Sequence, residues 1–283
     1  MSIVVTGATG SLGTLVIKEL LERTPASQIA AVARDATKAQ HLAEQGIEVR
    51  IADYGKPETL ASAFAPGDTV LLISGSEVGQ RVPQHKAVID AAAAAGASRL
   101  VYTSILGGPR ASFLLADEHK QTEQLIEESG LEHTILRNGW YTENYTAQIP
   151  VQRQHGVLGS AGDGRIAAAP RADYAAAAAV VLTTEGHGSA AYELNGDTSF
   201  ALAEYADELA RQTGEDIAYV EVSPAEHEDI LAGAGVPAAM AHILADVDIA
   251  IRQGQLASHG NDLSRLIGRP TTPVSDAIAA ALR

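Results

Sequence analysis

Three glycines near the start of the chain, Gly7, Gly10 and Gly13, have the spacing of a loop that binds phosphate groups. The run follows the apolar stretch 2–6 and opens an amphipathic segment at 12–21, which is the strand–turn–helix context that a dinucleotide-binding loop requires. Gly7 permits the turn, Gly10 lets a phosphate approach the backbone, and Gly13 lets the helix pack closely on the strand. The unpaired N–H groups at the helix start can then bind a pyrophosphate. We therefore expect a dinucleotide at this loop.

Arg34 distinguishes between the possible dinucleotides. It ends the second apolar run, 28–33, about 20 residues past the last glycine, where an NAD-binding protein carries an acid for the ribose hydroxyls. A planar guanidinium suits the 2′-phosphate of NADP, because it donates paired, charge-assisted hydrogen bonds. Asp35 is a competing ribose ligand, but it stands where the helical segment that follows needs an N-cap. Arg34 therefore favours NADP, with a solvent-exposed strand end as its alternative interpretation.

Polar residues also follow the later apolar runs. Asp53 and Tyr54 end the third run and could flank an adenine, although a turn or capping role explains Asp53 equally well. The small residues 74–76 end the fourth run and would let ribose and diphosphate lie close to the chain. Segment 138–144 follows the sixth run and supplies aromatic rings with amide and hydroxyl donors, which we expect beside nicotinamide. Packing beneath a second lobe is the alternative for its two aromatic residues.

The proton-transfer motif Tyr-x-x-x-Lys is missing from this sequence. Tyr102 is followed four residues later by Leu106, and Tyr141 by Tyr145. Where the motif is present, its lysine lowers the tyrosine pKa so that the hydroxyl can exchange a proton. Any catalysis here must therefore depend on other groups.

Two histidine-containing segments remain as candidates for chemistry. His119 lies early in the predicted helix 115–129 and could point toward the strand ends, although a lone histidine is usually structural. The run His-Glu-Asp at 227–229 has no second histidine at metal-binding spacing. We therefore predict a solvent-exposed helix face at 227–229 and no metal site, and we keep His119 as a candidate proton donor.

Composition narrows the range of partners. The 283 residues are 46% apolar and carry a formal net charge of −15, which disfavours nucleic acid and anionic membrane surfaces. There is no cysteine, so disulfides and thiolate metal sites are excluded. No basic, apolar leader opens the chain and no apolar run reaches membrane-spanning length. We expect a cytoplasmic protein, as a monomer or a homodimer, that acts on a small molecule.

The first half of the chain alternates short apolar runs with helical patterns, which predicts an α/β fold with a doubly wound parallel sheet. Predicted strands lie at 2–6, 28–33, 48–53, 69–74, 98–104 and 133–137, with helices at 12–21, 57–64, 83–95 and 115–129 between them. Such a sheet binds its ligand at the carboxyl ends of its strands. We place a Rossmann domain at 1–150 and a mostly substrate-side α+β lobe at 151–283. That lobe is discontinuous, because 186–197 is predicted to return to the main sheet, and it has a strand candidate at 217–222.

The chain resembles a known family in five motifs. The segments 6–13, 74–80, 115–119, 136–141 and 171–174 together are similar to the NmrA-like branch of the atypical short-chain dehydrogenases. Within that branch they resemble the bacterial type 2 NAD(P)H:quinone oxidoreductases, with the triphenylmethane reductases as near relatives. The resemblance spans nearly the whole chain, and it implies a Rossmann fold with a small C-terminal lobe, NADPH as hydride donor, and no flavin.

Site residues follow from the resemblance by position. It implies cofactor contacts at Gly7, Ala8, Thr9, Gly10, Ser11, Leu12, Arg34, Ser74, Gly75, Ser76, Asn138, Gly139, Trp140, Tyr141, Thr142 and Glu143. Arg171 is added as a cofactor contact or, equally, a structural ion pair. More distant relatives carry a catalytic lysine in the helix after the fifth strand, where this chain aligns His119 in place of Lys120.

The leading functional expectation is an NADPH-dependent, flavin-free reductase of quinones. A quinone needs little acid assistance, so positioning of nicotinamide and acceptor in a water-poor slot supplies most of the catalysis. A donor near one quinone oxygen, from Tyr141, Asn144 or His119, would stabilise the developing oxyanion. Two alternatives stay open: a non-catalytic NADP-binding redox sensor, and a reductase of triphenylmethane-type dyes or other conjugated acceptors.

Overall fold

The computed structural model describes residues 2–257 and 260–283, which form two compact units. Unit 1 comprises Met1–Gly108, Glu118–Asn138 and Arg171–Tyr192. Unit 2 comprises Pro109–Asp117, Gly139–Pro170 and Glu193–Arg283. This division differs from the predicted boundary at residue 150, because segment 139–150 belongs to unit 2 and the helix that begins at residue 171 belongs to unit 1.

A seven-stranded sheet with the order β3-β2-β1-β4-β5-β6-β8 organises unit 1. Its strands are β1 (Ile3–Val5), β2 (Ile29–Ala33), β3 (Glu48–Ile51), β4 (Thr69–Leu72), β5 (Arg99–Ile105), β6 (His133–Asn138) and β8 (Ala190–Leu194). Every pair from β3 to β6 is parallel. The strand order reverses at β1 and β4, the position where doubly wound sheets bind their ligands. The predicted fold class and the predicted return of the chain at β8 are both confirmed.

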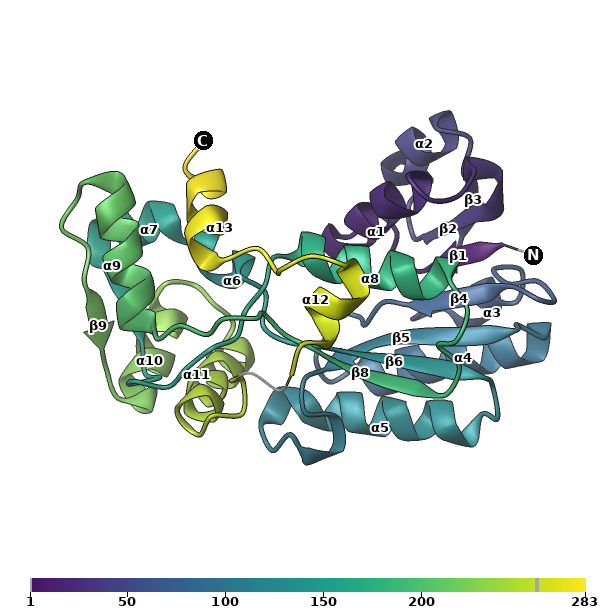
Figure 1. The fold of residues 1–283 in the computed structure, drawn as a ribbon. Helices are drawn as coiled ribbons and strands as arrows, with labels where there is room; N and C mark the ends of the chain where they lie inside the picture. The colour runs from purple at the N-terminus through teal and green to yellow at the C-terminus, as the bar shows by residue number, and fades with distance from the viewer. Residues whose placement is uncertain (1, 258–259) are drawn as a thin grey trace. The chain divides into compact units, whose positions relative to one another are not determined.

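Helices cover both faces of this sheet. They are α1 (Ser11–Leu21), α2 (Ala36–Glu44), α3 (Pro57–Leu60), α4 (Arg81–Ala95), α5 (Leu114–Glu128) and α8 (Arg171–Thr183), with short 3₁₀ turns at Ala26–Gln28 and Gly108–Arg110. Figure 1 shows α1 and α8 side by side along one face and α5 along the other. The packing of α8 on α1 is the reason that residues 171–183 belong to unit 1.

Local sequence signals account for several helix boundaries. The Asp35 carboxylate accepts hydrogen bonds from the N–H groups of Thr37 and Lys38, which confirms it as the N-cap of α2. Gly96 ends α4 in the left-handed conformation, at φ 74°, which favours glycine. The predicted helix 57–64 is too long: α3 ends at Leu60, and the next residues form a turn in which the Ala63 N–H bonds to the Leu60 carbonyl.

Unit 2 is mainly helical, with one small sheet. In that sheet β7 (Val157–Gly159) pairs in parallel with β9 (Tyr219–Glu221), which confirms the predicted strand near 217–222. The helices are α6 (Glu143–Thr146), α7 (Ile149–His155), α9 (Leu202–Thr213), α10 (Pro224–Gly233), α11 (Ala238–Arg252), α12 (Asp262–Ile267) and α13 (Val274–Ala281). Within the described residues, no helix has the length and apolar character needed to cross a membrane, and no cluster of side chains is arranged to hold a metal ion.

Candidate functional site

The glycine loop after β1 is shaped by close backbone contacts. Gly7 has φ +60°, and the Gly10 N–H bonds to the Gly7 carbonyl at 3.0 Å. A Cβ at Gly13 would lie 2.3 Å from the Gly7 carbonyl oxygen and 2.8 Å from Cα of Ala8. Only glycine fits at that position, so α1 begins directly against the turn. The loop therefore has the form that brings helix N–H groups to a pyrophosphate, and the residues present fit a dinucleotide.

Thr6 and Tyr54 lock this loop to the end of β4. The Thr6 hydroxyl donates to the Leu71 carbonyl at 2.9 Å and accepts hydrogen bonds from the Tyr54 hydroxyl and from the Ile73 N–H. Burial raises the pKa of Tyr54, so this phenol stays protonated and neutral. The Asp53 carboxylate accepts the Gly55 N–H at 3.0 Å, which is a turn role. Contact of Asp53 with an adenine stays a prediction.

Arg34 lies at the end of β2 with its side chain 67% exposed. Its Nη1 is 3.2 Å from Oε1 of Glu77, a residue of the segment between β4 and α4. An exposed ion pair of this kind contributes little to stability and is easily exchanged for another anion. The geometry leaves Arg34 able to bind the 2′-phosphate that the sequence predicts.

The segment 74–76 is held by side chains from two other elements. The Ser74 N–H bonds to the Thr103 hydroxyl at 2.9 Å. His85 Nε2 accepts the Gly75 N–H at 2.9 Å, and Arg81 Nε donates to the Gly75 carbonyl at 2.6 Å. Arg81 and His85 are not among the site residues predicted from the sequence. Their signal was their spacing of four residues on one face of α4, whose C-terminal half is mostly alanine.

His119 on α5 is buried, with 6% of its surface exposed, and lies in unit 1. Its Nδ1 is 2.7 Å from the hydroxyl of Tyr102, a fully buried residue of β5. Burial lowers the pKa of His119 well below its usual value, and the positive charge of Arg81 lowers it further. Burial raises the pKa of Tyr102. Both groups are therefore neutral, and the pair can transmit a hydrogen bond without carrying a charge.

Backbone pairing organises the segment after β6. The Gly139 N–H bonds to the Leu194 carbonyl at 2.7 Å. The Ala169 N–H bonds to the Trp140 carbonyl at 3.2 Å, and the Thr142 N–H bonds to the Ala169 carbonyl at 3.0 Å. Tyr141 and Asn144 on this fixed backbone are half-buried, and the Asn144 N–H closes a turn onto the Tyr141 carbonyl at 3.0 Å.

The predicted site residues divide between the units. Unit 1 contains Gly7, Ala8, Thr9, Gly10, Ser11, Leu12, Arg34, Asp53, Ser74, Gly75, Ser76, His119, Asn138 and Arg171. Unit 2 contains Gly139, Trp140, Tyr141, Thr142, Glu143 and Asn144. The cofactor and catalytic roles of these residues stay predictions.

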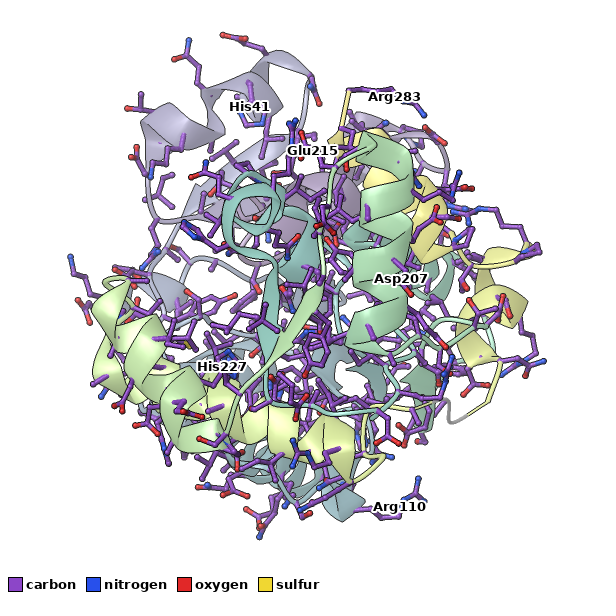
Figure 2. The ribbon with its side chains drawn as sticks, turned by 90° about the vertical axis from the view of Figure 1, so that its left-hand side faces the viewer. His41, Arg110, Asp207, Glu215, His227 and Arg283 are labelled. Carbon is purple, nitrogen blue, oxygen red and sulfur yellow. The ribbon has the colours of Figure 1, made fainter. Side chains whose placement is uncertain are left out.

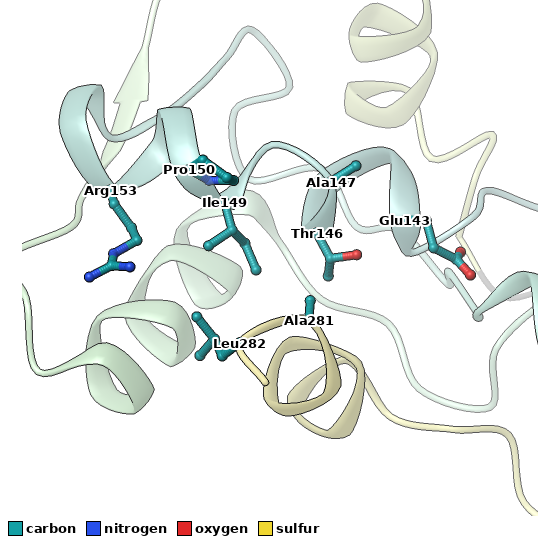
Figure 3. A pocket seen from close by; sticks show the side chains of 8 residues that line it. All are labelled: Glu143, Thr146, Ala147, Ile149, Pro150, Arg153, Ala281 and Leu282. Carbon is teal, nitrogen blue, oxygen red and sulfur yellow. The ribbon is translucent and has the colours of Figure 1, made fainter.

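Unit 2 also has a pocket of about 510 Å³ (Figure 3). Its lining is mostly apolar and comes from α6, α7 and the end of α13: Glu143, Thr146, Ala147, Ile149, Pro150, Arg153, Ala281 and Leu282. Glu143 is one of the predicted site residues, so this pocket adjoins the segment after β6.

A mostly parallel sheet with a glycine loop after its first strand defines a dinucleotide-binding protein of the Rossmann type. The chain matches the NAD(P)H-binding family over residues 7–185 and belongs to that family. It is 49% identical over 278 residues to quinone oxidoreductase 2 of Escherichia coli strain K12, covering 98% of this chain and 97% of the relative.

Two solved structures carry the comparison further. An NADPH-dependent quinone oxidoreductase from Escherichia coli, complexed with NADPH, is similar with a TM-score of 0.97 and 47% identity, covering 99% of this chain and 100% of that one. The triphenylmethane reductase of Citrobacter sp., complexed with NADP(H), has a TM-score of 0.94 and 38% identity, with coverage of 99% and 100%. The resemblance stated from the sequence and the expected nicotinamide dinucleotide are confirmed.

Proposed function

We propose that this protein is an NADPH-dependent reductase that transfers hydride to quinones. The observation that carries the proposal is the likeness, over 98% of the chain at 49% identity, to a quinone oxidoreductase. The glycine loop and the exposed guanidinium of Arg34 support the same cofactor. A solved relative with nearly the same fold is a complex with NADPH.

The chain's own residues bind and orient the reactants. Loop 7–12 holds the diphosphate through backbone N–H groups, Arg34 holds the 2′-phosphate, and segment 74–76 lies against the ribose. Bound NADPH would supply the hydride, which carries both electrons, and the second hydrogen of the hydroquinone would arrive as a proton from solvent. Because a quinone is already strongly electrophilic, no acid comparable to a Tyr-Lys pair is required, and a flavin is not needed as an intermediate carrier.

The residues that meet the acceptor act as hydrogen-bond donors. Tyr141 and Asn144 supply a hydroxyl and an amide on a backbone that is fixed by pairing with Ala169. His119 is neutral, so it offers an N–H donor without a charge that a buried site would have to solvate. A donor placed at the oxygen where negative charge develops stabilises the transition state more than the ground state.

The test is NADPH oxidation, followed at 340 nm, against a panel of quinones and a panel of triphenylmethane dyes. We expect the larger kcat/KM with a quinone. A larger kcat/KM with the dyes would favour the second candidate, which the similarity to triphenylmethane reductase supports. Binding of NADPH without turnover of any acceptor would overturn the enzyme assignment in favour of a redox sensor.

A further inference from the structure

The backbone N–H and the carbonyl of Gly75 are both hydrogen-bonded to side chains of α4. His85 Nε2 accepts the N–H at 2.9 Å and Arg81 Nε donates to the carbonyl at 2.6 Å. Ordinary loops satisfy such groups with water or neighbouring backbone, so two side-chain bonds to one residue, from positions six and ten residues further along the chain, restrict the loop strongly. A Cβ at Gly75 would lie 3.1 Å from Oε1 of Gln84, so the side chains of α4 approach the backbone closely here.

The hydrogen bonds around His85 determine which ring nitrogen carries the proton. Nε2 faces an N–H donor and must be unprotonated, so the proton of the neutral ring is on Nδ1. Nδ1 lies 2.9 Å from the Thr122 hydroxyl oxygen, and that hydroxyl donates its own proton to the Glu118 carbonyl at 2.8 Å. The direction of every bond from Gly75 to α5 is thereby consistent. Burial of His85 keeps the ring neutral, with its pKa lowered to about 3, and the charge of Arg81 adds to this shift.

Glu118 supports the hydrogen bond that Arg81 donates to the Gly75 carbonyl. Its Oε1 accepts the N–H groups of Gly79 at 3.0 Å and Arg81 at 3.2 Å, and its Oε2 is 3.8 Å from Arg81 Nη1. One carboxylate on α5 therefore holds the start of α4 and also balances the buried guanidinium. Arg81 and His85 stand one turn apart on α4, opposite Glu118 and Thr122, one turn apart on α5.

We propose that Arg81 and His85 are positioning residues that hold segment 74–76 in the conformation that receives the nicotinamide dinucleotide. The inference rests on the proposed contact of residues 74–76 with the cofactor. A loop that is already ordered loses less conformational entropy when it binds, so the effect of these residues appears in cofactor affinity. The chain of bonds through Thr122 makes the orientation of His85 part of the same arrangement.

The decisive variants are His85→Leu and His85→Gln, with NADPH affinity measured by calorimetric titration in the absence of acceptor. His85→Leu removes the acceptor for the Gly75 N–H, and we expect about a tenfold increase in Kd for NADPH, the scale of one lost hydrogen bond. His85→Gln places an amide oxygen near the position of Nε2, and we expect its Kd to return to within about threefold of wild type. Steady-state rates should show a raised KM for NADPH with little change in kcat.

His227→Leu is the matched control, because it removes another buried histidine that lies in unit 2. We expect it to lower Tm while leaving the Kd for NADPH unchanged. A wild-type Kd in His85→Leu together with a lowered Tm would overturn the proposal, and so would a His85→Gln variant that regains Tm but not affinity.

If His85→Leu does not fold, two other measurements test the positioning role of His85. Nitrogen-15 NMR of the wild-type histidines should show His85 with its proton on Nδ1, and a proton on Nε2 would overturn the proposal. Thr122→Val removes only the hydroxyl at the far end of the bond chain, and we expect a two- to fivefold rise in Kd for NADPH. Both measurements need no acceptor, so a failure of quinone turnover would be a separate result.

Discussion

Two buried histidines, one in each unit, have very different surroundings. His85 in unit 1 bonds through Nε2 to loop backbone and through Nδ1 to Thr122. His227 in unit 2, labelled in Figure 2, lies 3.2 Å from both the Ser160 hydroxyl and the Asp248 carboxylate, in each case through Nδ1. The first histidine connects a loop to two helices, whereas the second joins groups of the small sheet and two helices of the same unit.

Ser160, His227 and Asp248 form a group that we call the His227 cluster. It contains the residue types of a nucleophilic triad but lacks the geometry of one. A triad histidine bonds its carboxylate through one ring nitrogen and its nucleophile through the other. Here Asp248 and Ser160 share Nδ1 of His227, Ser160 is fully buried, and its N–H also bonds to Asp248 at 2.7 Å. The cluster therefore ties the end of β7 to α10 and α11. Contact between reactive residue types identifies a site only when each atom faces the right partner.

The prediction of a solvent-exposed face at 227–229 is wrong for His227, which is 7% exposed. The reason is tertiary: α10 packs on α11, and the face that carries His227 turns toward Asp248. In unit 2 we therefore expect segment 139–144 to have a functional role and the His227 cluster to have a structural one. Substitutions in each can test this difference.

The largest expected effect is on turnover, in segment 139–144. Asn144→Ala and Tyr141→Phe each remove one donor, and loss of an oxyanion partner costs about 10²–10³ in rate. We expect kcat with a quinone to fall far more than NADPH affinity changes. The measurement is steady-state kinetics beside NADPH titration, with His119→Ala as a comparison: a small effect marks His119 as structural, and a comparable one makes it a hydrogen-bond donor to the acceptor. Unchanged acceptor kinetics in folded Tyr141 and Asn144 variants would make the segment a packing element.

The second effect is on stability, in the His227 cluster. Asp248→Ala leaves the buried Ser160 N–H without its acceptor and removes the carboxylate beside His227 Nδ1, and we expect a loss of about 2–4 kcal/mol in the free energy of unfolding. Urea unfolding measures this loss. Asp248→Asn keeps an oxygen acceptor and should lose less. A marked change in kcat without a change in stability would reverse the assignment of this cluster.

The third prediction concerns Arg34 in unit 1, where a substitution should change the affinity for NADPH but not the stability of the protein. Arg34→Ala should weaken NADPH binding roughly tenfold to hundredfold, the equivalent of about 1.5–3 kcal/mol for a bidentate phosphate contact. NADH affinity and Tm should barely change, because the Arg34 side chain is exposed. Equal affinity of the wild-type protein for NADH and NADPH would contradict the role of Arg34.

Much of the fold followed from local signals in the sequence. The glycine loop, the Asp35 cap and the glycine at the end of α4 act on neighbouring residues, so spacing alone predicts them. The return of the chain at β8 followed from its apolar pattern at residues 190–194.

The hydrogen bonds of His85 and of the His227 cluster could not be predicted in this way, because they join residues that are far apart in the sequence. Ser160 and Asp248 are 88 residues apart, and His85 and Thr122 are 37 apart. Periodicity shows that a histidine lies on one face of a helix, but not which group from another element meets it. For that reason a role was predictable for His119, the contacts of His85 were not, and the predicted exposure of His227 is wrong.

The smallest effect we predict is the pH dependence of stability in unit 1. Burial lowers the pKa of His85 from 6.5 to about 3, so the unfolded chain takes up a proton that the folded chain excludes. Stability from this group is therefore complete above pH 6.5 and is lost progressively as pH falls toward 3. At pH 5.5, one unit below the pKa of the unfolded chain, the loss is about 1.4 kcal/mol, by the linkage of one pH unit to about 1.36 kcal/mol. Urea unfolding of wild type and His85→Gln at pH 7.5 and 5.5 isolates this contribution, because the carboxylates are common to both proteins. A wild-type protein that loses no more stability than His85→Gln over this range would show that His85 accepts a proton in the folded state, and the bond from Gly75 to Nε2 would then not be what holds the loop.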